Sequence, residues 1–337
     1  MMTRESGAPL AGVMAVVEYD EKKKLTKLSS QVLGAAQLLA RLTQNTVTAV
    51  LIGSSMDEAA RELIGYGTDR VILCRADTAD GHDIDRYVNA LVCMAEKYHP
   101  RYLLLPMSVT GREAAPRAAA LLDAGIMADC MAIGTAGDLL PVYTRLSFGG
   151  YLSTDVCFRD EGLQVITIRS GMFDKAVPNG RTGTILQEEI SGVPLLSRSR
   201  FLRQIHSAAE GILAVEDADV IVAGGRGAAG EKGFALIREL AGLLGGAVGA
   251  SRVAVDKGWI GHEALIGQSG KTVAPALYIT CGIAGSIQHI TGMRDSGCVV
   301  SVNTDPKALI FDVSDYGIVG DMFIVLPVLI EEIQRIR

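Results

Sequence analysis

The sequence predicts an α/β protein of two α/β domains, each a mostly parallel sheet flanked by helices. Short apolar runs rich in Val, Leu and Ile alternate with segments whose apolar residues recur every three or four positions, as buried strands alternate with amphipathic helices. Polar, glycine-punctuated segments follow the apolar runs of the last third. The 337 residues exceed one ordinary core, because a typical domain has about 150.

The first half repeats a strand-then-helix pattern. The expected buried strands are 12–19, 46–53, 70–75 and 101–107. The expected helices are 28–44, 56–65, 84–98 and 111–122. Three later runs alternate more regularly, with glycines between them, and are expected to form an antiparallel extension: 143–148, 152–158 and 163–169. This half is therefore expected to be a parallel sheet with added strands.

A segment with little periodicity separates the two halves. Residues 190–206 contain Ser, Gly, Pro and several Arg, a composition typical of a linker. The sequence thus predicts domains at 1–200 and 201–337. In the second, strands are expected at 219–223, 276–281, 298–303 and 308–313, and helices at 231–244 and from about 320 onward.

Composition excludes several classes of function. The formal net charge is -6, and nucleic-acid binding needs a basic face, so no nucleic-acid partner is expected. The 6 cysteines include no C-x-x-C pair and the 5 histidines have no metal-ligand spacing, so no metal is expected. No apolar run approaches the roughly 20 residues of a membrane helix. The run at 10–17 ends in a charged turn and is expected to be a strand, not a signal peptide, so a cytoplasmic protein is the expectation.

Polar segments follow the apolar runs of the second half. They are 222–227, 249–252, 267–271, 282–289, 302–306 and 314–321. A strand that ends in glycines and opens a helix offers free N–H groups and a positive dipole end to a phosphate. Because the carboxyl ends of parallel strands meet at one edge of a sheet, where nucleotides bind, these segments together predict a site for a large nucleotide cofactor.

Each segment alone has a plainer interpretation. The glycines of 224–227 could serve only to turn the chain, and Ser251 with Arg252 could lie in a surface turn. The loop 267–271 lacks the glycine spacing of a phosphate-binding G-K-[ST] loop. Asp321, at the start of the last helix, could be only a capping carboxylate. Their common placement is what favours a cofactor site.

In this order and at this spacing the segments resemble the C-terminal FAD domain of electron transfer flavoprotein alpha subunits. The resemblance is most specific at 224–321, including Tyr278, Gly285 and the pair Gln288 and His289. It is looser at 114–129 and 165–169 but covers nearly the whole chain. It implies a Rossmann-like, FAD-binding second domain and no catalytic residue in this chain.

The resemblance also implies roles for single residues. Arg252 would lie against the isoalloxazine and favour the anionic reduced flavin, since a fixed cation stabilises developing negative charge. Ser269 would place its hydroxyl near flavin N5, and His289 would hydrogen-bond the pyrimidine carbonyl edge. The ribityl, diphosphate and adenosine would be bound by Arg226, Ser251, Gln268, Gln288, Asn303 and Asp321. The glycine turn adds Gly282, Gly285 and Ser286 to the cofactor-binding set.

Two positions depart from the family pattern. Ser269 stands where the family commonly has threonine, so the hydroxyl stays but the methyl that fixes its rotamer is lost. Ala284 stands where serine is common, which removes a hydroxyl from the glycine turn. Both substitutions are compatible with FAD binding, and both bear on its redox potential.

Family members are heterodimers with a smaller beta subunit and accept electrons from acyl-CoA or other flavin dehydrogenases. The expected function is therefore electron transfer on bound FAD. One alternative is the alpha subunit of a bifurcating complex that oxidises NADH through its beta subunit. Alternatives from other classes are a nucleotide-dependent catalytic oxidoreductase, for which only His289 and Cys281 could supply a base or nucleophile, and a redox-silent nucleotide-binding scaffold.

Overall fold

The computed structural model describes residues 12–20, 23–53, 56–76, 83–137, 140–148, 152–159, 162–180, 183–190, 202, 214–216 and 218–336. The chain divides into two compact units, Met1–Gln204 and Ile205–Arg337. The linker expected at 190–206, and the boundary expected at residue 200, lie largely outside the described residues.

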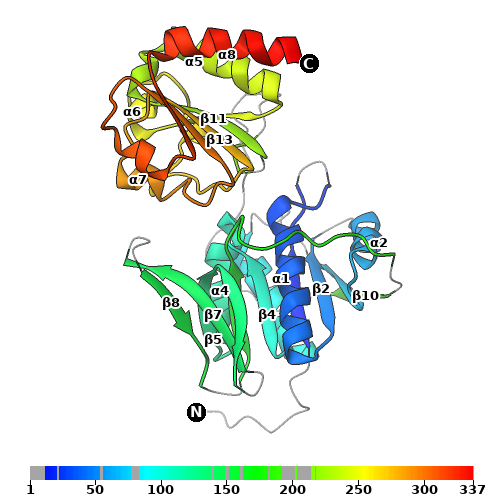
Figure 1. Cartoon of the computed structure of the whole chain (residues 1–337). Coiled ribbons are helices and arrows are strands. Elements are labelled where there is room, and N and C mark those ends of the chain that lie inside the picture. The colour runs from blue at the N-terminus through cyan, green and yellow to red at the C-terminus, as the bar shows by residue number, and fades with distance from the viewer. Residues whose placement is uncertain are drawn as a thin grey trace. The chain divides into compact units, whose positions relative to one another are not determined.

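The first unit is built on a seven-stranded sheet in the order β10-β3-β2-β1-β4-β9-β5 (Figure 1). Every neighbouring pair in it is parallel. Its strands are β1 (Val13–Val17), β2 (Val47–Ile52), β3 (Arg70–Arg75), β4 (Tyr102–Pro106), β5 (Gly125–Cys130), β9 (Gln164–Ile168) and β10 (Thr184–Glu189). The sheet order places β1, the first strand in the chain, between β2 and β4, the arrangement of a doubly wound fold.

Helices cover both faces of this sheet. They are α1 (Lys27–Thr43), α2 (Asp57–Gly65), α3 (Ile84–Tyr98) and α4 (Val109–Leu121). The first two share a core cluster with one face, and the last two share a cluster with the other. Helix α1 shows how local sequence sets an element: the side chain of Thr26 accepts a hydrogen bond from the Ser29 N–H at its start, and Gln44 adopts a left-handed conformation at its end.

An antiparallel extension is present, but with different members than expected. The three-stranded antiparallel sheet consists of β6 (Ala132–Ala136), β7 (Leu140–Ser147) and β8 (Leu152–Val156). The prediction was wrong for 163–169, since β9 is wholly buried and pairs in parallel with β4 and β5. Val165 packs into one core cluster and Ile166 into the other, which is the environment of a central strand covered on both faces.

The second unit has a five-stranded parallel sheet in the order β12-β11-β13-β14-β15 (Figure 1). Its strands are β11 (Val220–Gly224), β12 (Ala247–Ala250), β13 (Leu277–Cys281), β14 (Val299–Asn303) and β15 (Tyr316–Val319). Two long helices, α5 (Glu231–Leu244) and α8 (Met322–Ile336), pack against one core cluster. Shorter helices are α6 (Arg252–Asp256), α7 (Ile287–Ile290) and the 3₁₀ turns η2 (Arg226–Ala228), η3 (His262–Ala264) and η4 (Leu309–Val313). The fold class predicted from the sequence is confirmed.

The run at 308–313 is not the strand that was expected. It forms the 3₁₀ helix η4, in which Ile310 is buried against the second core cluster of this unit. The hydroxyl of Ser314 donates to the Ile310 carbonyl at 2.6 Å and closes the turn. A short apolar run fits a buried strand or a buried helical turn equally well, and the strand at this edge is β15 instead.

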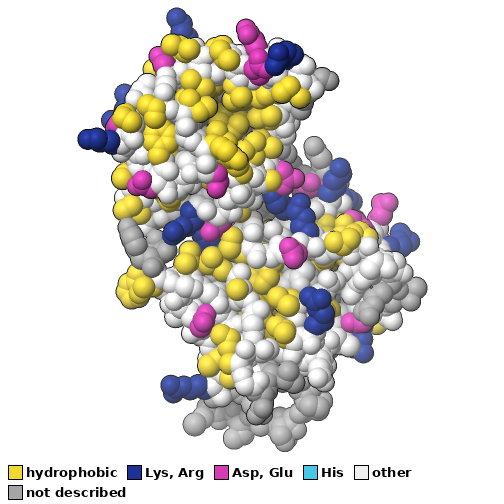
Figure 2. Space-filling model, viewed as in Figure 1, with side chains coloured by type: hydrophobic (Ala, Val, Ile, Leu, Met, Phe, Trp, Pro, Cys, Tyr) yellow, Lys and Arg dark blue, Asp and Glu magenta, His cyan; other side chains and the backbone are white. Residues whose placement is uncertain are grey.

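Membrane-spanning helices, metal-ligand clusters and disulfides are absent from the described residues. No helix among them is long and apolar enough to span a bilayer. No group of three or more His, Cys, Asp or Glu side chains there could hold a metal ion, and the six cysteines are unpaired. On the face seen in Figure 2 acidic and basic side chains are interspersed.

Candidate functional site

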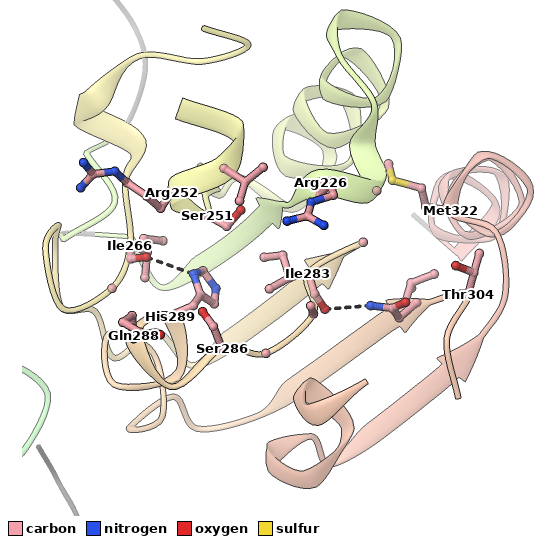
Figure 3. Close-up of a pocket in the computed structure, with 18 of the residues that line it drawn as sticks. Arg226, Ser251, Arg252, Ile266, Ile283, Ser286, Gln288, His289, Thr304 and Met322 are labelled. Atoms are coloured by element: carbon pink, nitrogen blue, oxygen red, sulfur yellow. Dashed lines mark hydrogen bonds between the residues drawn. The ribbon is translucent and has the colours of Figure 1, made fainter. Parts of the chain in front are cut away.

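A pocket of about 570 Å³ lies at the carboxyl edge of the second sheet, a size typical of small-molecule sites. It is lined by the segments that follow all five strands, β11 to β15 (Figure 3). Eleven of the twelve residues expected from the sequence line it: Arg226, Ser251, Arg252, Ser269, Gly282, Gly285, Ser286, Gln288, His289, Asn303 and Asp321. Gln268 does not line it: its side chain is exposed, and its backbone N–H donates to the Gln288 carbonyl at 2.7 Å.

Glycines let two strand-end turns meet at the floor of the pocket. The N–H of Gly227, after β11, donates to the carbonyl of Gly282, after β13, at 3.0 Å. A Cβ on Gly282 would lie 2.5 Å from the Cα of Gly227, and Gly282 has a φ of +64°. Any side chain at residue 282 would therefore push the two turns apart. They follow β11 and β13, the neighbouring strands at which the strand order changes direction.

The turn at 284–286 presents unused backbone donors to the pocket. The N–H groups of Ala284, Gly285 and Ser286 donate to no atom of the described residues. Gly285 has a φ of +83°, and a Cβ there would lie 2.1 Å from the Ile310 N atom in η4. Successive free N–H groups in such a turn form a concave anion site, so the turn can hold a phosphate without the hydroxyl that Ala284 lacks.

Two arginines extend around the pocket in different directions. In Figure 3 Arg226 lies over the strand ends, and Arg252 extends along the outer rim. The Arg252 Nε donates to Asp256 at 2.9 Å, and its Nη1 donates to the hydroxyl of Ser269 at 3.2 Å. Because the Ser269 oxygen accepts this bond, its own hydrogen is free to donate toward a bound molecule.

His289 contacts protein on both sides of its ring. Its Nδ1 lies 3.0 Å from the Ile266 carbonyl (Figure 3), and its Nε2 lies 3.1 Å from the hydroxyl of Tyr278. The residue is 4% exposed, and burial lowers the pKa of its imidazole to about 4, while the bond to Ile266 opposes that effect. His289 is therefore neutral at pH 7. Both of its ring nitrogens have protein partners, so the expected bond to a flavin carbonyl, which stays a prediction, would require one of these two contacts to break.

Two polar side chains of the pocket lining, Asn303 and Asp321, hydrogen-bond to nearby backbone groups. The Asn303 amide donates to the Ile283 carbonyl at 2.8 Å, and its oxygen accepts from the Asp305 N–H at 2.9 Å. One oxygen of Asp321 caps α8 by accepting from the Phe323 N–H at 2.9 Å. The plainer interpretation of Asp321 as a cap is thus correct for one oxygen, and the residue also lines the pocket.

Sequence reasoning missed the apolar part of the wall. The lining residues outside the segments expected to form the site are Val253, Leu265, Ile266, Met322 and Phe323. Apolar side chains next to strand ends read as core in a sequence, and only their position after each strand could have indicated them. With the polar groups they give a slot that has apolar walls and a few converging donors, as cofactor sites do.

Neither Cys281 nor His289, the two candidates for a nucleophile or a base, is available for that role. Cys281 is fully buried, and burial raises the pKa of its thiol to about 12, so it is a neutral thiol. His289 has no nitrogen without a partner. These two were the only candidates for a catalytic oxidoreductase, and neither is placed to abstract a proton.

The parallel sheet, the phosphate-type turn and the pocket at the strand ends together define a nucleotide-cofactor-binding α/β protein. The comparisons narrow this class. Residues 214–294 match the family model of the electron transfer flavoprotein FAD-binding domain, and residues 13–191 match that of the electron transfer flavoprotein domain. The chain belongs to the electron transfer flavoprotein family, and its second unit carries the FAD-binding domain.

Curated relatives agree with this assignment over almost their full lengths. The alpha subunit of electron transfer flavoprotein from Thermoanaerobacterium thermosaccharolyticum is 40% identical, over 93% of this chain and 95% of the relative. The alpha subunit from Megasphaera elsdenii is 38% identical, over 97% and 98%. A protein of Anaerotignum propionicum named acryloyl-CoA reductase electron transfer subunit beta is 33% identical, over 93% of each chain. The family resemblance drawn from the sequence is confirmed, and so is FAD as the cofactor.

Proposed function

We propose that this chain is the FAD-carrying alpha subunit of a heterodimeric electron transfer flavoprotein, and that the pocket at the strand edge of its second unit holds the cofactor. The observation that carries the proposal is the convergence of eleven expected residues on one pocket. FAD supplies reversible electron uptake when bound. The protein's task is to bind it and to set its potential.

The residues present suit an extended dinucleotide. The free N–H groups of 284–286 and the guanidinium of Arg226 provide donors for a diphosphate. The second oxygen of Asp321 can accept from a ribose hydroxyl. Ile266 and Ile283 provide apolar surface for a ring.

Arg252 and Ser269 carry the electronic role in this proposal. A guanidinium stays charged at all physiological pH values. At the rim of the pocket it favours the negative charge that the cofactor gains on reduction. The Ser269 hydroxyl, held by Arg252 at 3.2 Å, has a hydrogen left to donate to a ring nitrogen.

We further propose that the partner chain is an electron transfer flavoprotein beta subunit and that the electron donor is a flavin dehydrogenase. The relatives' names as subunits support the first point. The name acryloyl-CoA reductase electron transfer subunit supports a donor or acceptor that acts on acyl-CoA compounds. The unpaired cysteines support a cytoplasmic location, where thiols stay reduced.

The test is the flavin content of this chain co-purified with its beta subunit, followed by exposure to NADH. One FAD per heterodimer that cycles between redox states and does not react with NADH supports a simple carrier. Two FADs with NADH-driven reduction support the bifurcating alternative. A well-folded heterodimer without flavin overturns the proposal, and substrate turnover by this chain alone favours a catalytic oxidoreductase.

A further inference from the structure

Three separate elements enclose the imidazole of His289 at the wall of the pocket. Helix α7 carries the residue, the loop 265–271 supplies the carbonyl of Ile266, and β13 supplies the hydroxyl of Tyr278. Tyr278 is fully buried on the side of the sheet opposite α5 and α8. Tyr278 does not itself line the pocket, so it can act on a bound molecule only through His289.

The position of the Ile266 carbonyl is fixed by its own loop. The Ile266 N–H donates to the Ala250 carbonyl at 3.0 Å, which ties the loop to the end of β12. The Gln268 N–H donates to the Gln288 carbonyl at 2.7 Å, which ties the loop to α7. A carbonyl can only accept, so the Nδ1 atom of His289 facing it at 3.0 Å must carry the hydrogen.

The tautomer of His289 follows from this. A neutral imidazole with its hydrogen on Nδ1 has a lone pair on Nε2. The hydroxyl of Tyr278, 3.1 Å away, is therefore the donor of that bond. Burial raises the pKa of Tyr278 far above its usual value, so the hydroxyl keeps its hydrogen.

We infer that Tyr278 is a positioning residue of the cofactor pocket, whose hydroxyl donates to Nε2 of His289 and so fixes the ring orientation and the neutral Nδ1–H tautomer that a bound cofactor meets. The inference rests on the proposed function only in that the pocket holds FAD. It assigns His289 the part of a neutral, rigid wall. It leaves Arg252 as the charged group at the flavin.

Other titratable groups near the ring do not change this assignment. On β13, Cys281 is a buried neutral thiol. On the adjacent elements, Arg252 is bonded to Asp256 and Ser269, and Lys271 is bonded to Glu216 at 2.7 Å. The bond from Tyr278 stabilises the unprotonated Nε2 and therefore opposes protonation of the ring.

The test compares Tyr278→Phe with Tyr143→Phe in the full-length chain with ¹⁵N-labelled histidine. Tyr143 is an equally buried tyrosine of the first unit, whose hydroxyl donates to Gln164 at 2.7 Å, so its replacement removes a comparable bond far from the pocket in sequence. His289→Gln assigns the His289 signals. In the wild type without flavin we expect one protonated Nδ1 and one unprotonated Nε2, unchanged from pH 8 to pH 5.

In Tyr278→Phe we expect a mixture of tautomers and titration of His289 at higher pH, with unaltered signals from the other histidines. Bound FAD should dissociate roughly tenfold more readily, as expected when a buried acceptor loses its donor. Tyr143→Phe should match the wild type in both readouts. An Nε2–H tautomer in the wild type, or a Tyr278→Phe spectrum equal to that of the wild type, would overturn the inference. The spectra need no flavin, so a chain that never binds FAD refutes the proposed function and still tests Tyr278.

Discussion

Arg252 divides its guanidinium between two protein groups. The bond from Nε to Asp256 is an exposed ion pair on one turn of α6, and the bond from Nη1 reaches Ser269 across the rim of the pocket. An exposed pair of this kind contributes little to stability. The two bonds matter more for orientation, because together they fix the direction of the guanidinium and of its remaining N–H groups.

Arg252→Gln should lower the flavin midpoint potential and leave FAD bound. Removing the fixed cation destabilises the reduced flavin. A change of one to two powers of ten in the one-electron equilibrium constant corresponds to roughly 60–120 mV. The measurement is a redox titration of the heterodimer. Lys257→Gln removes an equal charge at the C-terminal end of α6, from a residue that contacts Trp259 and does not line the pocket. Equal shifts in both variants would show that only net charge matters.

Glu18 is a half-buried residue of the first unit whose only side-chain bond among the described residues is from the Ser108 hydroxyl at 2.8 Å. Burial raises the pKa of Glu18 to about 7, and the bond from Ser108 opposes the shift. The folded chain therefore holds this proton more tightly than the unfolded chain does. The resulting stability is complete below about pH 4.5 and is lost as pH rises through about 7.

Glu18→Gln should remove that pH dependence. Between pH 5 and pH 8 the free energy of unfolding of the wild type should fall by roughly 2–3 kcal/mol relative to the variant. Urea unfolding at the two pH values measures it. Glu96→Gln, at an exposed site on α3, should keep the wild-type dependence. Parallel curves for the wild type and Glu18→Gln would contradict the assignment.

At the scale of elements, the pocket depends on two turns that touch through backbone atoms alone. Gly282→Ala should destabilise the second unit by roughly 2–4 kcal/mol, because its φ is +64° and its Cβ would meet Gly227 at 2.5 Å. FAD affinity should fall with it. Gly242→Ala provides a matched control in α5, where a Cβ meets nothing within 4 Å, and should stabilise by roughly 0.5–1 kcal/mol. Chemical unfolding of both variants is the measurement, and equal effects would contradict the contact.

Elements with strong local signals could be predicted from the sequence. The helix expected at 231–244 is α5 with the same bounds, since Gly230 precedes it and Gly245 ends it in a left-handed conformation. The strand at 163–169 was assigned to the wrong sheet, because alternation does not reveal which strands become its neighbours. Pairing of β9 with β4 and β5 is a tertiary outcome.

The pocket residues also divide into those that the sequence predicts and those whose placement depends on tertiary contacts. Residues such as Arg252 and Ser286, which follow strand ends, were found because parallel strands share one carboxyl edge. Gln268, by contrast, is exposed and does not line the pocket, and its backbone is bonded to Gln288, a contact that no sequence pattern encodes. The ring partners of His289 come from segments that lie 11 and 23 residues away, so its tautomer could not be anticipated.

At the scale of the whole molecule, the two units should respond separately to the cofactor. FAD binds only to the folded second unit in the proposed function, so at a free concentration of one hundred times its Kd it should stabilise that unit by about 2.7 kcal/mol. The first unit, Met1–Gln204, should unfold as before. Calorimetry with and without FAD measures this. If both transitions move together, the units unfold as one.

The strand order of the first unit also constrains how the chain folds on the ribosome. β10 pairs with β3 in register from Thr184 opposite Arg70, and more than a hundred residues of chain separate the two strands. At translation rates of about 5–20 residues per second, the outer edge of β3 stays unpaired for roughly 5–20 seconds until β10 has been synthesised. β5 likewise waits for β9. Because β9 also pairs with β4, nascent chains of this protein expose three unpaired strand edges, on β3, β4 and β5, for seconds. Those intervals are when a ribosome-associated chaperone has the most surface to bind.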